Sequence, residues 1–275
     1  MTVIGEALAL FSAFCWALNG TIYKIGLRYG DVVSANFVRV TLTSFGFLLI
    51  MLAKGDVIIS APNWVWPMLI VSAIFAFFFG DMLYMESIRR CGISRAVPLS
   101  STYPLFVSLW SALIFGRLEL NVVFGAILVI LSIYTIVGEN GRYDPLGYVM
   151  ALGGAVFWSF SITIVKVLTS YLPPEVIAGF RFAVVSVLLL PIAFGRKFDL
   201  RCVKWMAFSS VVMVVGNYAF VTALSLASAP IVSTLSALYP IIAQFFALSV
   251  RESVNLRIIV GTILAFLGVI TLIMI

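Results

Sequence analysis

The sequence contains no histidine, and only 10% of its 275 residues are charged. Without histidine it cannot form a Ser-His-Asp triad, a His-ligated haem site or an HExxH zinc site. Its three cysteines, Cys15, Cys91 and Cys202, have none of the close spacings that indicate a metal site or a disulfide framework. It also lacks a Walker motif and a Gly-x-Ser-x-Gly motif, which argues against ATP use and against a serine hydrolase. We expect no cofactor and no metal.

Polar sequence is scarce, because 63% of the residues are hydrophobic and the mean hydropathy is +1.18. A soluble domain is about 45–50% apolar and about 25% charged. The composition therefore predicts a polytopic protein of the cell membrane whose main partner is the lipid bilayer. The net charge of +6 does not indicate nucleic-acid binding. Its basic residues lie singly or in pairs between apolar runs, where membrane proteins carry anchors and orientation signals.

Apolar runs of the length of a membrane helix, ~20 residues, recur along the whole chain. The first run has no basic segment before it and recurs later in the sequence, so we expect it to be a span and not a signal peptide. We predict an all-α membrane protein with ten spans, separated by short loops. The spans are approximately Ile4–Ile25, Val32–Leu52, Val65–Ser87, Ala96–Phe115, Leu120–Val137, Leu146–Leu168, Pro174–Phe194, Val203–Ala227, Pro230–Val250 and Arg257–Met274.

The chain is also an internal repeat, because polar and aromatic residues recur in register. At an offset of 142 positions the matched pairs are Gly5/Gly147, Trp16/Trp158, Thr21/Thr163, Ile22/Ile164, Lys24/Lys166, Tyr29/Tyr171, Arg39/Arg181 and Ser44/Ser186. After a loop that is shorter in the second copy, the offset becomes 136. The pairs are then Gly80/Gly216, Leu99/Leu235, Ser100/Ser236, Tyr103/Tyr239, Pro104/Pro240 and Gly125/Gly261.

Each copy contains five predicted spans, and five is an odd number. The second copy must then enter the membrane in the opposite orientation. We therefore predict two inverted five-helix repeats, residues 1–140 and 141–275. In transporters of this design the substrate site lies near the midplane, between the repeats.

The basic residues predict an orientation for this arrangement. Apart from the in-span Arg39 and Arg181, twelve of them lie by the loops after odd-numbered spans and three by the loops on the other side. The positive-inside rule then places both termini outside the cell. The twelve are Lys24, Arg28, Arg89, Arg90, Arg95, Arg142, Arg196, Lys197, Arg201, Lys204, Arg251 and Arg257, and the three are Lys54, Arg117 and Lys166.

These motifs resemble those of the ten-helix EamA-type members of the drug/metabolite transporter superfamily, over nearly the whole chain. The carrying residues are the repeat pairs Gly5/Gly147, Trp16/Trp158, Lys24/Lys166, Arg39/Arg181, Tyr103/Tyr239 and Pro104/Pro240, with the stretch Val250-Arg251-Glu252…Gly261. One departure is that Gly116 stands where Glu252 has its repeat counterpart. The resemblance implies a cavity lined by spans 1–4 and 6–9 and transport of small organic solutes, often outward. It also implies cytoplasmic termini, opposite to the charge count.

Four polar residues inside spans are the first candidates for a substrate or coupling pathway, because a charge there is costly and is a functional candidate by default. They are Arg39, Arg181, Asp81 and its repeat counterpart Asn217. Asp81 could couple transport to a proton. It could equally be a buried carboxylate that bonds to a backbone group or to one of the arginines. The two arginines could in the same way be structural ties.

The other candidates are aromatic residues and prolines at equivalent depths in the two halves. Trp16, Trp158, Tyr103 and Tyr239 could line a cavity or simply pack between helices. Pro104 and Pro240 fall within predicted spans, where each removes a helical hydrogen bond and kinks its helix. We expect them near the cavity, with bundle curvature as the alternative.

The function predicted from the sequence is a secondary transporter, an exporter of small metabolites such as amino acids, working by alternating access. A membrane scaffold or assembly protein without transport is the alternative. An intramembrane enzyme fits less well, because the usual catalytic motifs are missing. Nothing in the sequence points to an oligomeric state.

Overall fold

The computed structural model describes residues 2–55, 60–115, 120–137, 144–252 and 254–271, and over these ranges the chain is helical without strands. The first half contains α1 (Thr2–Gly26), α2 (Val32–Lys54), α3 (Val65–Ala73), the π-helical segment η1 (Ile74–Gly80), α4 (Asp81–Cys91), α5 (Ile93–Ser100), α6 (Tyr103–Phe115) and α7 (Leu120–Val137). The second half contains α8 (Pro145–Leu168), α9 (Pro174–Ala193), α10 (Leu200–Leu226), α11 (Ala229–Ser236), α12 (Tyr239–Ser249) and α13 (Leu256–Ile270).

These elements form the ten predicted spans, with bounds within about one helical turn of those expected. In the described part of the chain, seven helical stretches are long and apolar enough to cross a membrane by themselves, and shorter apolar helices accompany them. Three spans are made of more than one element. The third is α3, η1 and α4 in series, the fourth is α5 and α6, and the ninth is α11 and α12.

The breaks in spans four and nine correct the expectation of a kinked but continuous helix at each proline. Pro104 and Pro240 are the second residues of α6 and α12, where the missing N–H is not needed for the helix. At the end of α5 the Pro98 carbonyl accepts from the Ser101 hydroxyl at 2.7 Å. The Val97 and Leu99 carbonyls accept from the hydroxyls of Ser100 and Thr102, at 3.1 and 2.8 Å, in addition to backbone N–H groups. A membrane helix can break where side chains satisfy the freed backbone in this way.

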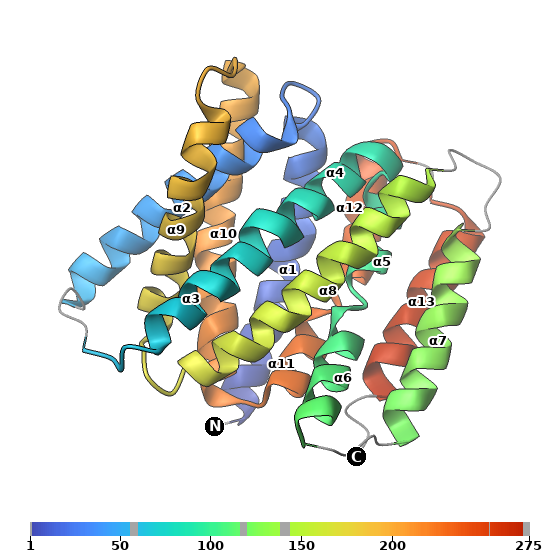
Figure 1. Cartoon of the computed structure of the whole chain (residues 1–275). Coiled ribbons are helices and arrows are strands. Elements are labelled where there is room, and N and C mark those ends of the chain that lie inside the picture. Colours follow the sequence, from blue (N-terminus) through green and yellow to red (C-terminus); the bar gives the residue numbers. More distant parts are fainter. Residues whose placement is uncertain (1, 56–59, 116–119, 138–143, 253, 272–275) are drawn as a thin grey trace.

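The two halves pack through equivalent contacts. α1 lies along α10, and its counterpart α8 lies along the third span, α3–η1–α4. α2 packs against its own counterpart α9, and α7 against its own counterpart α13. In Figure 1, α1 and α8 run in opposite directions through the bundle, as inverted repeats require. Each half therefore supplies much of the surface on which the other packs.

The ends of the chain agree with an even number of spans. Figure 1 places the start of α1 and the end of α13 at one end of the bundle, whereas α7 ends and α8 begins at the other. The loop near Asn140, which the sequence places opposite the termini, lies outside the described residues.

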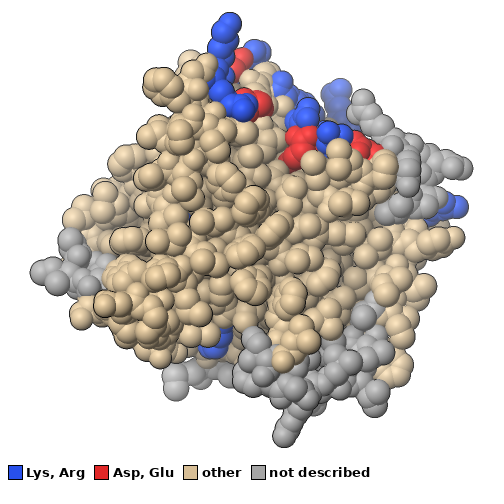
Figure 2. Space-filling model, in the orientation of Figure 1, with Lys and Arg blue, Asp and Glu red and all other residues tan. Residues whose placement is uncertain are grey.

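Charged side chains in Figure 2 gather at the upper end of the molecule, where α9 ends and α8 and α10 begin. The middle of this face is free of charged side chains and suits contact with lipid.

Candidate functional site

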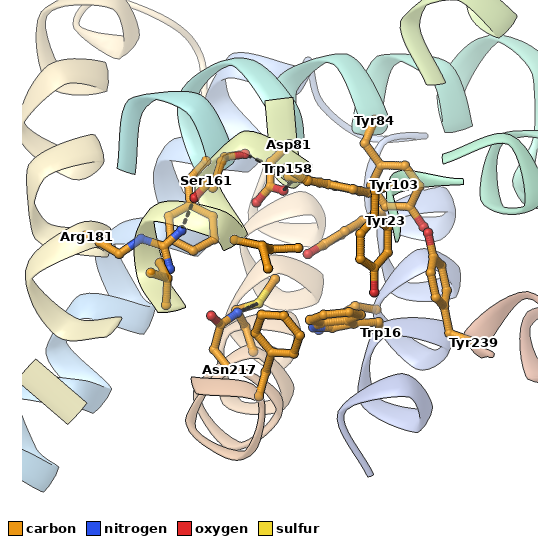
Figure 3. A pocket seen from close by; sticks show the side chains of 17 residues that line it. Trp16, Tyr23, Asp81, Tyr84, Tyr103, Trp158, Ser161, Arg181, Asn217 and Tyr239 are labelled. Carbon is orange, nitrogen blue, oxygen red and sulfur yellow. Dashed lines mark hydrogen bonds between the residues drawn. The ribbon is translucent and has the colours of Figure 1, made fainter. Parts of the chain in front are cut away.

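A cavity lies between the two repeats, and we call it the inter-repeat cavity (Figure 3). The space in it that the centre of a water molecule can occupy is about 90 Å³, which is room for several water molecules. The residues that line it are Trp16, Asn19, Tyr23, Ala76, Phe77, Asp81, Tyr84, Tyr103, Trp158, Ser161, Ile162, Val165, Arg181, Met213, Asn217, Phe220 and Tyr239.

Most of this lining consists of pairs that the internal repeat relates to each other. The pairs are Trp16/Trp158, Asn19/Ser161, Tyr23/Val165, Phe77/Met213, Asp81/Asn217, Tyr84/Phe220 and Tyr103/Tyr239. The same backbone positions of the two inverted repeats therefore face one space. The chemistry differs within the pairs, so the cavity is symmetric in backbone and asymmetric in polarity.

Asp81 forms a buried ion pair with Arg39. The Nη2 atom of Arg39 lies 2.5 Å from Oδ2 of Asp81, and the Arg39 side chain is fully buried. Arg39 also donates to Oδ1 of Asn36, at 2.6 Å from Nη2, and to the hydroxyl of Tyr23, at 3.2 Å from Nη1. The other carboxylate oxygen of Asp81 accepts from Trp158 Nε1 at 2.9 Å. Asp81 thus links spans 2, 3 and 6.

The π-helical segment η1 orients Asp81 and exposes backbone acceptors beside it. The Asp81 N–H bonds to the carbonyl of Ala76, five residues back. The Ala76 carbonyl also accepts from Trp158 Nε1 at 3.2 Å, and the Phe77 carbonyl accepts from Asn36 Nδ2 at 2.9 Å. Such bulges are frequent at functional sites. The equivalent helix of the other half, α10, is a continuous α-helix through Asn217.

Arg181 is buried like Arg39, with 4% of its surface exposed, but its surroundings differ. Its Nη2 atom donates to Ser161 Oγ at 2.7 Å and to the Ser72 carbonyl at 3.5 Å. Its guanidinium carbon lies 4.6 Å from the centre of the Phe77 ring. Figure 3 shows its guanidinium directed into the cavity from α9. Among the described residues, no carboxylate forms an ion pair with it.

The tyrosines at the broken spans make reciprocal contacts across the repeat axis. Tyr103 contacts Ser236 Oγ through its hydroxyl at 3.0 Å, and Tyr239 contacts Ser100 Oγ at 2.9 Å. Ser100 and Ser236 are equivalent in the repeat, as are Tyr103 and Tyr239. The two contacts are therefore equivalent as well.

The tryptophans pack on these tyrosines. Trp16 lies edge-on to Tyr103 and Tyr239, and Trp158 lies edge-on to Tyr84 and Tyr103.

Seven of the ten predicted pathway residues line the cavity. Arg39 binds Asp81 but does not line the cavity. Pro104 and Pro240 do not line it either.

Near the charged end of the bundle a second cluster joins the two halves. Lys24 Nζ donates to the Ile88 carbonyl at 3.2 Å and lies 3.2 Å from Oε1 of Glu252. Glu252 in turn accepts from the backbone N–H groups of Ile93 and Ser94, at 3.0 and 2.9 Å, at the start of α5. The carboxylate therefore ties α1, α5 and the end of α12 together.

The repeat equivalent of this cluster lacks the carboxylate. Lys166 Nζ donates to the carbonyls of Leu224 and Ala227, at 2.6 and 2.8 Å, and Leu224 is the counterpart of Ile88. Gly116, the counterpart of Glu252, lies outside the described residues. Pro230 stands in place of Ser94, so the start of α11 offers one N–H fewer for a carboxylate to bind.

Several lining residues could have been predicted from helix geometry. Tyr23 lies seven positions after Trp16, on the same face of α1. Ser161 and Val165 lie three and seven positions after Trp158 on α8. The helical spacing from the predicted tryptophans thus identifies further residues that line the cavity. Tyr84 follows Asp81 by one turn in the same way.

Comparison with known proteins agrees with the repeat and with the fold. The model of the EamA-like transporter family matches the chain twice, over residues 3–138 and 145–274. A protein of Archaeoglobus fulgidus described as an uncharacterized transporter is 32% identical over 273 residues, covering 97% of both chains. A crystal structure with 19% sequence identity superposes with a TM-score of 0.68 over 98% of this chain and 94% of its own, which supports the fold. The chain is a multi-pass membrane protein and belongs to the EamA-like transporter family.

Proposed function

We propose that the protein is a secondary transporter that carries small organic metabolites, amino acids among the candidates, through the inter-repeat cavity by alternating access. The observation that carries this proposal is the paired lining of the cavity by equivalent positions of two inverted repeats. Exchanging the conformations of two such repeats would open the same site first to one side of the membrane and then to the other.

The polarity of the cavity supports a substrate that is a small organic molecule. Aromatic side chains form much of its wall, and a few polar groups, among them Asp81, Arg181 and Asn217, face the same space. A mainly apolar site with a few convergent polar groups is typical of small-molecule binding. Transport outward is the direction that the resemblance to exporters favours.

A coupling proton remains a further proposal, with Asp81 as the group to test. Both oxygens of this carboxylate are engaged, by Arg39 and by Trp158. Proton binding there would remove the counter-charge of Arg39, and the oxygen without the proton could still accept from the indole N–H. Protonation would thereby be connected to the packing of spans 2 and 3.

Flux measurements on reconstituted protein test the proposal. We would replace Cys15, Cys91 and Cys202 by alanine, introduce cysteines at Lys24 and Glu252, and join them with a short reducible bis-methanethiosulfonate. Uptake of a panel of labelled amino acids and organic acids should be saturable for at least one solute. It should stop on cross-linking and return with reductant.

The single-cysteine variants treated in the same way serve as controls. If the protein is a scaffold, the uptake rate of every solute will equal that of protein-free liposomes, although the protein is folded and inserted. That result would contradict the proposed function.

A further inference from the structure

We propose that Arg181 is the anion-binding residue of the inter-repeat cavity, and that the substrate is an organic monocarboxylate with a flat apolar body. This rests on the proposed function, because it names the substrate class of the same cavity. The argument starts from the difference between two arginines that the internal repeat makes equivalent.

Arg39 is fully neutralised and bonded within its own half, whereas Arg181 is not. The partners of Arg39 are Asn36, Tyr23 and Asp81. The repeat places Ala178, Val165 and Asn217 at the three equivalent positions around Arg181. Each replacement removes an acceptor or a negative charge. The second half therefore has an equivalent buried cation, but a different residue at each of the three positions whose side chains bind Arg39 in the first half.

The hydrogen bonds of Arg181 leave part of its guanidinium free. Both of its bonds, to Ser161 Oγ and to the Ser72 carbonyl, come from Nη2. Its Nε–H is buried without a partner, and Nη1 makes no hydrogen bond in the described part of the chain. An arginine has five N–H donors, so the Nε–H and the two N–H groups of Nη1 remain available to an anion, and hydrogen bonds from a charged donor to a carboxylate are strong. Ser161 and the Phe77 ring hold the guanidinium in place, so the remaining donors have fixed positions.

Two more buried polar groups around the cavity lack a partner, and both can donate. They are Nδ2 of Asn19 and the hydroxyl of Tyr84. A buried donor without a partner is costly, and all three donors belong to side chains that line the same cavity, so they point to an acceptor that arrives with the ligand. Each of these groups can donate to an oxygen atom of an anionic ligand.

The net charge of the site favours a ligand with a single negative charge. Two guanidiniums, of Arg39 and Arg181, surround one carboxylate, Asp81, so this group carries one net positive charge. A monoanion neutralises it, whereas a dianion such as a phosphate ester would leave a negative charge buried. An ammonium group would find only Asp81 among the described acidic lining residues, and Arg39 already engages it.

The remaining walls determine the body of the ligand. Five aromatic residues line the cavity, namely Trp16, Trp158, Tyr103, Tyr239 and Phe220. Such walls stack on flat apolar groups and leave them few polar partners. The carboxylate at Arg181 thus combines with a ring or an unsaturated chain that lies between the tryptophans.

Binding of a matched series of probes to the purified protein tests the charge preference. 3-Phenylpropionate, phenylalanine and 2-phenylethylamine share one ring and differ only in which charged groups they carry. We expect 3-phenylpropionate to bind about tenfold or more tightly than phenylalanine, and 2-phenylethylamine to bind least. Phenyl phosphate provides the dianion arm and should bind more weakly than 3-phenylpropionate. Stronger binding of the amine or of the phosphate would overturn the proposed substrate class.

The internal repeat supplies the variants that test Arg181. Asn217→Asp puts a carboxylate in the register position of Asp81 and should neutralise Arg181, so binding of 3-phenylpropionate should fall about tenfold or more. Arg181→Gln should give the same loss by removing the charge. Asn63→Asp, the same chemical change at an exposed residue before α3, is the control and should leave binding unchanged.

Two results would overturn the assignment, provided that the variants elute as folded protein. One is undiminished binding of 3-phenylpropionate to Arg181→Gln. The other is undiminished binding to Asn217→Asp, which adds a group and keeps Arg181, and which carries the test if Arg181→Gln does not fold. Failure here is distinct from failure of the proposed function, because flux of another solute through the cavity would stand without an anion site at Arg181.

Discussion

The buried ion pair between Arg39 and Asp81, 2.5 Å apart, exists in one repeat and not in the other. In the second repeat the equivalent residues are Arg181 and Asn217, and no bond joins them among the described residues. The two halves therefore share a backbone plan but not an electrostatic one. This difference gives the first prediction.

Asp81→Asn should destabilise the protein, because it leaves the Arg39 cation buried without its counter-charge. Loss of one partner of a buried ion pair costs about 3–5 kcal/mol. Arg39→Gln combined with Asp81→Asn should recover part of this loss. Thermal unfolding in detergent measures both, and transport per folded molecule is recorded beside it. A stable Asp81→Asn protein without transport would instead assign Asp81 to coupling or substrate binding.

Trp158→Phe should also destabilise the protein, and more than Trp16→Phe does. The indole N–H of Trp158 donates to Asp81 Oδ1, and a hydrogen bond to a charged group contributes roughly 1.5–3 kcal/mol. No hydrogen bond from Trp16 Nε1 is found in the described part of the chain, so the ring change there removes no bond. Equal losses in the two variants, measured by thermal unfolding, would contradict this account.

Glu252→Gln should loosen the charged end of the bundle. The carboxylate binds Lys24 and two backbone N–H groups at the start of α5, and a neutral amide offers only one oxygen for these partners. We expect faster proteolysis or hydrogen exchange at Ile93 and Ser94. Glu252→Asp, which keeps the charge, is the control. Unchanged exchange in Glu252→Gln would show that α5 is held by packing alone.

Acid should weaken the start of α8 through Asp144. The backbone N–H of Gly147 lowers the pKa of the Asp144 carboxyl, and Arg90 adds to this effect. A carboxyl with a lowered pKa in the folded state stabilises the protein above its unfolded pKa of about 3.9, and the stability is lost as the pH falls through the folded value.

Asp144→Asn should remove this pH dependence, because asparagine caps helices as well as aspartate but does not titrate there. Melting temperatures between about pH 2 and pH 5 should fall with acidity in the unchanged protein and less steeply in the variant. Identical slopes would contradict the assignment to Asp144.

The sequence predicts the number, order and approximate bounds of the spans, because apolar runs and the repeat each identify them independently. It does not predict where spans four and nine break. Pro104 and Pro240 signal a disturbance, but whether a helix kinks or restarts depends on which groups satisfy the freed carbonyls. The hydroxyl of Ser101 does so here, for the carbonyl of Pro98. The π-helical segment before Asp81 has no sequence signal that we recognise.

The partner of Asp81 could not be chosen from the sequence. Arg39 and Arg181 are equivalent in the repeat, and each was a candidate. The choice depends on Asn36 and Tyr23, which surround Arg39 and have apolar counterparts in the second half. A position-by-position comparison of the two halves around each arginine would show this difference between their neighbours.

Accessibility of the inter-repeat cavity from each side of the membrane tests the central claim most directly. We would place a single cysteine at Ile162, which lines the cavity, in a chain whose three native cysteines are replaced, with buried Val185 as the control position. The account predicts that an impermeant maleimide labels Ile162→Cys from either side of sealed oriented vesicles, and does not label Val185→Cys. Labelling of Ile162→Cys from one side only, or from neither, would contradict alternating access through this cavity.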